Sequence, residues 1–296
     1  LDYYRRFLEA APTVEALAAL PEDQLMKLWQ GLGYYSRARN LQRAARQIME
    51  EHGGIFPSTY EEIRALSGVG DYTAGAISSI AFHQPVPAVD GNVLRVTARI
   101  CGDDGDISPP AMKKKVTRAL EEIIPLDAPG DFNQAMMELG ATVCLPNGAP
   151  LCDRCPAAAF CAAHRAGRET DFPVKPPKKE RRVEERAVWL IFRSGRLALR
   201  RRPEKGLLAG LWECPNDLLA EGETPICPVA GEAAFAASGK HIFTHIEWHM
   251  RAYLVRAEGE KLPPGWVWAD RREIAERYSL PSAFAPFGHI IEENLG

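Results

Sequence analysis

The amino-acid sequence has no apolar run that approaches the ~20 residues needed to cross a bilayer. It also shows no secretory or transit peptide at its start. The chain opens at Leu1 within an amphipathic helical pattern, and we therefore expect that an upstream segment is missing. A net charge of −3 neither favours nor excludes a nucleic-acid partner, because such partners bind local basic patches. These absences predict a cytoplasmic protein without a membrane partner.

Three of the seven cysteines stand by themselves in the sequence: Cys101, Cys214 and Cys227. A chain without a secretory signal is expected to keep its thiols reduced. Isolated cysteines behave as small hydrophobic side chains. We therefore expect all three to be buried and unpaired.

The other four cysteines lie between positions 144 and 161, with the spacing C-x7-C-x2-C-x5-C. They are Cys144, Cys152, Cys155 and Cys161. Thiolates this close converge on a metal more readily than they form disulfides. Two centres fit, a structural zinc with four thiolates or a 4Fe–4S cluster. Zinc sites usually contain two C-x2-4-C pairs, and only one such pair is present, so the spacing favours the cluster.

The pattern of apolar residues divides the chain into two parts. Helical periodicity runs to about residue 143, with short breaks at Gly and Pro. A polar, proline-containing stretch follows the cysteines, and strand-like runs come after it. We predict an all-α domain over residues 1–164 with the cysteine loop (144–161) at its end. A linker over 165–185 and a smaller α+β domain over 186–296 complete the prediction.

A glycine-containing turn joins two predicted helices near residue 70. The first helix (60–65) stops at Gly68-Val69-Gly70, and the second begins at once. Glycines let the backbone of so short a turn approach a surface closely. The unpaired N–H groups of the second helix can then bind an anion such as a DNA phosphate. An ordinary tight corner between two helices fits the same pattern.

Asp90 lies directly ahead of another predicted helix. An aspartate in that position is a routine N-cap. The order of glycine turn, aspartate and four cysteines resembles the helix-hairpin-helix base-excision glycosylases with a 4Fe–4S cluster, the endonuclease III superfamily. The stretches 31–40 and 132–140 and the C-terminal domain are most similar to the MutY-type adenine DNA glycosylases. This resemblance covers nearly the whole chain.

The resemblance implies a monofunctional glycosylase that removes adenine paired with 8-oxoguanine or guanine in double-stranded DNA. Asp90 matches the carboxylate that stabilises the oxocarbenium-like sugar. Tyr72 takes the place of the lysine with which bifunctional relatives form a Schiff base, and a tyrosine cannot form an imine. Asn92 is a further candidate for this site, with a helix-surface asparagine as the alternative. A 4Fe–4S cluster bound by the four cysteines is implied as the cofactor.

Two residues match positions that contact the DNA around the excised base. Tyr34 matches an aromatic wedge inserted into the duplex beside the lesion, and a buried core tyrosine is the alternative. Gln134 falls where the family lines the adenine pocket, and its amide could read the flipped base. The family's general acid, a glutamate in an upstream helix, has no match. We therefore expect a truncated chain with little activity, because losing a general acid costs about 10²–10⁴ in rate.

The C-terminal domain resembles the MutT-like (Nudix-fold) module of the same family, because Arg202-Pro203 and the stretch 206–215 match the start of that fold. Residues 216–240 offer only scattered glutamates rather than the carboxylate array that a Nudix hydrolase needs for its metals: Glu221, Glu223 and Glu232. Hydrolysis of a pyrophosphate bond is therefore not expected. Thr244 and His245, preceded by a phenylalanine, match a Phe-Ser-His loop that contacts 8-oxoguanine. The start of a β-strand is the alternative reading of these residues.

Three rival functions stay open. One is a lesion-binding module without turnover, and another is an endonuclease III-like glycosylase/lyase on oxidised pyrimidines, against which Tyr72 and the second domain argue. The third is a zinc-ribbon DNA-binding protein. The resemblance favours a monomer that acts on DNA in the bacterial cytoplasm, in association with the nucleoid.

Overall fold

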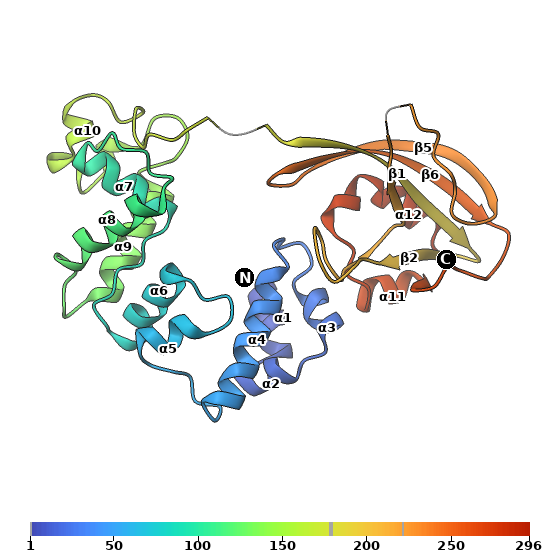
Figure 1. The fold of residues 1–296 in the computed structure, drawn as a ribbon, viewed down its shortest axis with the longest axis horizontal. Helices are drawn as coiled ribbons and strands as arrows, with labels where there is room; N and C mark the ends of the chain where they lie inside the picture. The colour runs from blue at the N-terminus through green and yellow to red at the C-terminus, as the bar shows by residue number, and fades with distance from the viewer. Residues whose placement is uncertain (1, 178–179, 221) are drawn as a thin grey trace. The chain divides into compact units, whose positions relative to one another are not determined.

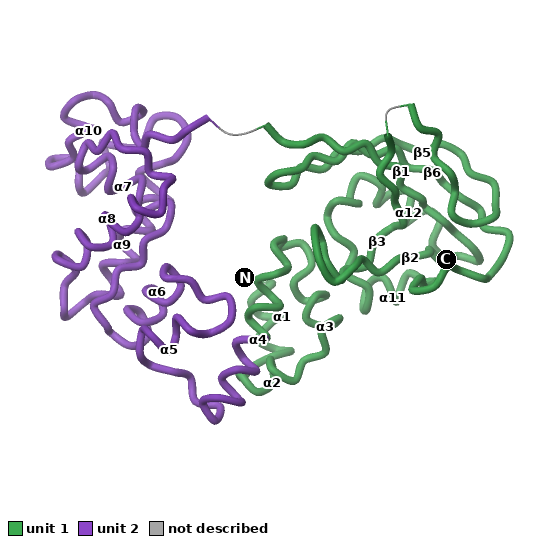
Figure 2. Tube along the Cα trace, in the orientation of Figure 1, with its two compact units in different colours: residues 1–42, 179–296 green, residues 43–178 purple. Residues whose placement is uncertain are grey.

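The computed structural model describes residues 2–177, 180–220 and 222–296. The chain divides into two compact units (Figure 2). Unit 1 comprises Leu1–Gln42 and Lys179–Gly296, and unit 2 comprises Arg43–Lys178. In the part of the chain that is described, no helix combines the length and the apolar character needed to cross a membrane.

The regular secondary structure of unit 2 is helical in the described residues, as predicted (Figure 1). Its elements are the end of α4 (Ser36–Glu51), α5 (Tyr60–Ala65), α6 (Asp71–Phe82), α7 (Gly91–Cys101), α8 (Pro110–Glu121), α9 (Pro129–Thr142), η1 (Cys152–Arg154), η2 (Ala158–Phe160) and α10 (Ala162–Arg165). Helix α9 packs against both α6 and α7. A core of Val89, Val93, Val116 and Leu120 joins α7 and α8, with Phe132 of α9 packed against it. Helix α9 therefore lies at the centre of unit 2 and contacts the elements that carry the predicted site.

Unit 1 contains a seven-stranded mixed sheet with the order β3-β2-β1-β6-β5, in which β4 pairs with β1 and β7 with β2. Its long strands β1, β5 and β6 lie together in Figure 1. The strands are β1 (Arg182–Arg193), β2 (Arg196–Arg201), β3 (Trp212–Glu213), β4 (Asn216–Leu218), β5 (Gly231–Ile242), β6 (Ile246–Ala257) and β7 (Trp266–Ala269). Strands β1 and β6 run parallel, with Leu190 opposite Leu254, whereas the other pairs are antiparallel. The central run of β1 is buried on both faces, which explains its continuous apolar sequence.

Short helices complete unit 1. After the sheet come α11 (Arg271–Glu276), which contacts β7, η3 (Ser282–Phe287), which contacts β5, and α12 (Gly288–Asn294). The start of the chain supplies α1 (Asp2–Ala10), α2 (Val14–Ala19) and α3 (Glu22–Leu28). Phe287 packs into the sheet core beside Trp248. Lys27, at the end of α3, donates to the Ile274 carbonyl (2.8 Å), and Ser279 donates to the Met26 carbonyl (3.1 Å). These polar contacts explain why residues 1–42 group with the sheet.

The predicted fold class, an all-α part followed by a smaller α+β part, is confirmed. Helix α5 has the predicted bounds. The domain boundaries at 164 and 186 stay predictions, and the boundary at residue 42 was not foreseen. Two residues of the predicted linker, 178 and 179, and the candidate carboxylate Glu221 lie outside the described residues.

Candidate active site and four-cysteine centre

The glycine turn is a helical hairpin braced by side chains. Thr59 and Glu62 form a reciprocal capping box that starts α5. Gly68 has φ +76°, a conformation that glycine adopts without strain. Gly70 is the N-cap of α6, and no atom lies within 4 Å of the position that its Cβ would take. Of the three predicted contact residues Gly68, Val69 and Gly70, it is Gly70 that leaves open space beside the first turn of α6.

Arg64 holds the two arms of the hairpin together, a role that the sequence did not reveal. Its Nε donates to Asp71 Oδ1 (2.5 Å), and its Nη1 donates to the Val69 carbonyl (3.2 Å). The hydrogen bond from Arg64 lowers the pKa of Asp71. Since Asp71 opens α6, its negative charge would oppose an incoming phosphate, and Arg64 offsets that charge.

Asp90 caps α7 and also faces the site. Its Oδ1 accepts from the Val93 backbone N–H (2.8 Å), which confirms the predicted N-cap. Its Oδ2 accepts from Asn92 Nδ2 (3.0 Å). Asn92 is therefore half-buried and tied to the carboxylate rather than being a free surface residue. Both oxygens of Asp90 are held in a fixed orientation.

A buried arginine extends this set of contacts to the cysteine loop. Arg95 Nη2 donates to Asn92 Oδ1 (2.8 Å) and to the Gly140 carbonyl (2.7 Å). Its Nε donates to the Cys144 carbonyl (2.9 Å). The hydrogen bonds thus run without interruption from Asp90 through Asn92 and Arg95 to the first cysteine. Sequence analysis missed Arg95, whose place in the apolar pattern of α7 gives no sign of its partners.

Tyr72 lies in the first turn of α6, close enough to Asp90 for their charges to interact. Burial raises the pKa of Tyr72, and the Asp90 carboxylate raises it further. The ring is 37% exposed, and its hydroxyl donates to Met137 Sδ (3.4 Å). Gln134 is exposed one helical turn before Met137 and lies on the same face of α9. Tyr72, Asp90 and α9 are therefore brought together, as the sequence predicted.

The segment that leads into Asp90 has no regular structure and is fixed by α9 and α6. Asn133 Oδ1 accepts from the Ala88 N–H (2.9 Å), and its Nδ2 donates to the Val86 carbonyl (2.9 Å). Gly75 of α6 touches the same segment, since a Cβ there would lie 2.3 Å from the Pro87 carbonyl oxygen. Asn133 and Gly75 position Asp90, and the sequence carried no signal for either role.

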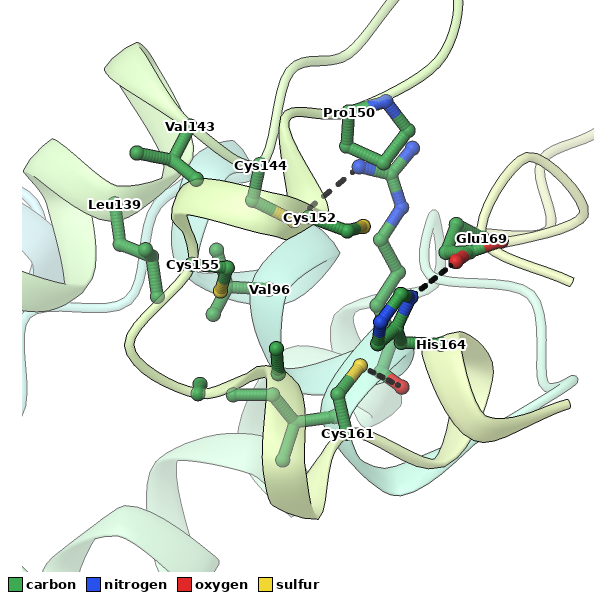
Figure 3. A pocket seen from close by; sticks show the side chains of 14 residues that line it. Val96, Leu139, Val143, Cys144, Pro150, Cys152, Cys155, Cys161, His164 and Glu169 are labelled. Atoms are coloured by element: carbon green, nitrogen blue, oxygen red, sulfur yellow. Dashed lines mark hydrogen bonds and ion pairs between the residues drawn. The ribbon is translucent and has the colours of Figure 1, made fainter. Parts of the chain in front are cut away.

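The four predicted metal ligands converge on one cavity in unit 2 (Figure 3). Apolar side chains also line it, among them Val96 of α7, Leu139 of α9 and Val143, which follows α9. None of the four thiols forms a disulfide. Arg99 Nη1 donates to Cys144 Sγ (3.2 Å), and Cys161 Sγ donates to the Arg99 carbonyl (3.3 Å). The donor set and its apolar surroundings fit a metal centre of four thiolates.

The surroundings of Cys152 disfavour a free thiolate. Burial, together with the negative charge of Glu169, raises the pKa of Cys152 to about 11. A thiol with this pKa is protonated near neutral pH, and metal coordination is what stabilises a thiolate in such a place. Of the three isolated cysteines, Cys214 is buried as predicted, Cys227 is half-buried, and Cys101 is exposed, against the prediction, because it ends α7 at the surface.

A separate pocket lies within unit 1 and contains the other predicted contact residues. Tyr34, Arg39, His241, Thr244 and His245 all line it. The Tyr34 hydroxyl and Thr244 Oγ1 are 3.3 Å apart. Tyr34 is 70% exposed, so the buried-core alternative is wrong. Its φ of +48° turns the ring outward from the 31–35 turn, a conformation that is uncommon for a side chain other than glycine.

Comparison with known proteins agrees with both parts of the chain. Residues 1–125 match the family model of the HhH-GPD superfamily base excision DNA repair proteins, and residues 187–288 match that of the NUDIX domain. A solved structure of a thermostable thymine-DNA glycosylase is similar with a TM-score of 0.51 and 28% identity. The similarity covers 56% of this chain and 76% of that one.

Curated relatives extend the similarity across almost the whole sequence. The adenine DNA glycosylase of Mus musculus is 34% identical over 334 residues, which cover 93% of this chain and 65% of the mouse protein. That of Rattus norvegicus is 35% identical over 354 residues, which cover 96% of this chain and 67% of the rat protein. The chain thus spans about two thirds of the length of these relatives. Identity at this level, sustained through the helical and the sheet-containing parts alike, shows that the chain belongs to the adenine DNA glycosylase family.

Proposed function

We propose that the chain acts in base-excision DNA repair as a monomer that hydrolyses the N-glycosidic bond of adenine paired with 8-oxoguanine or guanine. One observation carries the proposal. The Asp90 carboxylate is fixed at the start of α7, where it interacts with Tyr72 of the hairpin. When a base departs from deoxyribose, positive charge develops on the sugar, and a carboxylate in a fixed orientation can stabilise that charge.

Departure of adenine leaves positive charge on the sugar, which becomes oxocarbenium-like. The Asp90 carboxylate would stabilise that charge at the face of the ring that adenine leaves. Two hydrogen bonds, from the Val93 backbone and from Asn92, already orient it, so little reorganisation accompanies the reaction. Water then attacks the sugar. Tyr72 has no amine with which to form an imine, so strand cleavage through a Schiff base is not expected.

The hairpin supplies a place for the DNA backbone. The first-turn N–H groups of α6 lack partners within the helix, and Gly70 leaves the space in front of them open. Arg64 offsets the charge of Asp71 at this end. A phosphate bound here would hold the duplex while the adenine is turned out of the stack. Gln134, on the Met137 face of α9, is the candidate reader of the flipped base.

The pocket of unit 1 is the candidate reader of the base opposite adenine. Thr244 replaces the serine of the family loop and keeps a hydroxyl, which lies beside the Tyr34 hydroxyl. The exposed Tyr34 ring is free to stack against bases, and the Thr244 hydroxyl can donate to or accept from a purine edge. Together they would distinguish 8-oxoguanine from guanine.

We further propose that Cys144, Cys152, Cys155 and Cys161 hold a 4Fe–4S cluster. When bound, such a cluster would give the loop the rigid centre that its own few apolar side chains do not supply. Hydrolysis itself moves no electron. Arg95 and Arg99 contribute independently of the cluster, since they bind the Cys144 and Leu145 carbonyls and attach the loop to α7.

Single-turnover adenine release from an 8-oxoguanine·adenine duplex tests the function. No residue matches the family's general acid. Residues 1–296 should therefore release adenine at a single-turnover rate about 10²–10⁴-fold lower than that of a form that contains one. Asp90→Asn should lower the remaining rate by about 10²–10³. Asparagine caps a helix as well as aspartate, so this variant keeps the fold.

The controls separate the rivals. An 8-oxoguanine·cytosine duplex should yield no free base. Specific binding of the 8-oxoguanine·adenine duplex with no release, even at high enzyme concentration, would identify a lesion-binding module instead. Covalent trapping by borohydride would contradict a monofunctional glycosylase and favour the lyase.

A further inference from the structure

Three side chains at the partly exposed edge of the four-cysteine cavity form a group of their own (Figure 3). Cys152 belongs to η1, His164 to α10, and Glu169 to the turn after α10. One ligand atom of each, a thiol sulfur, an imidazole nitrogen and a carboxylate oxygen, lies within 4.8 Å of the other two. Among the described residues, this is the one set of three or more such side chains with that spacing.

The three groups already lie close together. His164 Nδ1 and Glu169 Oε1 are 2.6 Å apart, and the Cys152 sulfur lies within 4.8 Å of a ligand atom of each. The His164 and Glu169 side chains are 37% and 21% exposed. A cation can therefore reach them from solvent without any rearrangement of the helices around the cavity.

We propose that, when the cavity contains no cluster, Cys152, His164 and Glu169 bind a single divalent cation of the Zn²⁺ or Fe²⁺ class. Sulfur, imidazole nitrogen and carboxylate oxygen are together the donors that such borderline cations prefer. Bond lengths of about 2.0–2.3 Å place tetrahedral donors roughly 3.3–3.6 Å apart, so His164 Nδ1 and Glu169 Oε1 would separate slightly and the Cys152 sulfur would adjust to that spacing. On binding, the Cys152 thiol gives up its proton to solvent and the His164 ring takes the tautomer with its proton on Nε2. The cation thereby replaces the hydrogen bond between His164 and Glu169. Water can fill the fourth position.

This site and a four-thiolate cluster exclude each other, because Cys152 belongs to both sets. A Zn²⁺ ion bound here would therefore slow the assembly of a cluster, a consequence that rests on the cluster proposed above. Binding of the cation by itself does not depend on glycosylase activity, so a failure of either proposal can be recognised separately.

Titration of the cluster-free full chain with Co²⁺, under reducing and anaerobic conditions, tests the site. The wild type should bind one Co²⁺ per chain, with a thiolate-to-cobalt charge-transfer band. His164→Phe and Cys152→Ser should weaken binding by about tenfold or more. Cys155→Ser is the matched control, since it removes a thiol from the same cavity but not from the group, and it should bind Co²⁺ as the wild type does.

Two results would overturn the proposal. One is binding that is lost equally in Cys155→Ser and Cys152→Ser but unchanged in His164→Phe, which describes a site of four thiolates. The other is an absence of stoichiometric binding by the wild type. Should His164→Phe fold poorly by circular dichroism, Glu169→Gln takes its place, because it lies outside α10. Reconstitution with iron and sulfide gives a second measurement. Zn²⁺ should delay cluster formation more in the wild type than in His164→Phe, which keeps all four cysteines.

Discussion

Replacing Gly75 with alanine should displace Asp90 although the two residues lie on different elements. The added Cβ would lie 2.3 Å from the Pro87 carbonyl oxygen and 3.3 Å from Ala88 Cα. Both are backbone atoms, and Asn133 holds the segment on its other side through Val86 and Ala88. Relief of the clash therefore requires α6 or the segment before Asp90 to move by about 1 Å, to reach ordinary contact distance.

Two opposing terms set the size of the effect on stability. Overpacking of this kind costs about 1–3 kcal/mol. Alanine in a helix interior returns about 0.5–1 kcal/mol relative to glycine. Because the neighbour is backbone and cannot rotate away, overpacking should prevail, with a net loss of about 1–2 kcal/mol. Gly91→Ala is the matched control. Gly91 follows Asp90 as the first residue of α7, and no atom lies within 4 Å of the position that a Cβ added there would take. It should stabilise by up to about 1 kcal/mol.

Urea unfolding of the full chain can follow the stability of each unit separately in both variants. All six tryptophans fall within unit 1: Trp29, Trp189, Trp212, Trp248, Trp266 and Trp268. Fluorescence therefore follows unit 1, whereas helical circular dichroism follows mainly unit 2. Gly75→Ala should lower the midpoint of the dichroism transition, Gly91→Ala should raise it, and neither should move the fluorescence transition.

Adenine release provides the functional half of the test. A misplacement of about 1 Å can cost 10²-fold in rate, so Gly75→Ala should lose far more activity than its stability explains. Gly91→Ala should retain the rate of the wild-type chain. Stabilisation of the same sign and size by both substitutions, with unchanged release, would refute the argument that α6 positions Asp90.

Three further predictions concern other parts of the site. Arg95→Met leaves the Gly140 carbonyl unpaired, and the dichroism-detected stability should fall by about 2–4 kcal/mol, with Arg95→Lys intermediate. Thr244→Val removes the hydroxyl beside Tyr34 and should reduce the preference for 8-oxoguanine·adenine over guanine·adenine duplexes about 2- to 10-fold in binding titrations, while Thr244→Ser retains it. Burial lowers the pKa of His241, so its contribution to the stability of unit 1 is complete above about pH 6.5 and is lost as pH falls through the lower folded-state pKa. Fluorescence-detected unfolding between pH 5 and 8 should show that decline in the wild type and a smaller one in His241→Phe.

Local signals explain which elements the sequence could predict. Helix α5 was placed correctly because its ends are encoded nearby, by the Thr59–Glu62 capping box and by Gly68. Strand β5 was missed because its sequence, GEAAFAASGKHI, is rich in alanine and glycine and has little alternation of apolar and polar residues. Its strand conformation comes from pairing with β6 along its whole length, which is a long-range property.

In the candidate site, too, features encoded by local spacing could be predicted, whereas contacts between distant positions could not. The N-cap role of Asp90 and the convergence of the four cysteines follow from spacing along the chain, and both are present in the structure. The contacts of Asn133 with Val86 and Ala88 join positions 47 and 45 residues apart, and nothing in the local sequence predicts them. The same holds for the pairing of Tyr34 with Thr244 across 210 residues.

These long-range contacts explain how a residue in an irregular segment can be held firmly enough for chemistry. Pro85 and Pro87 remove two N–H donors from the stretch before Asp90, so fewer backbone groups there need partners. Asn133 satisfies two of those that remain. On the far side of Asp90, Asn92 and Arg95 continue the restraint to the Cys144 carbonyl. The carboxylate is thus restrained from both directions along the chain, and disorder in the cysteine loop would release one of the two restraints.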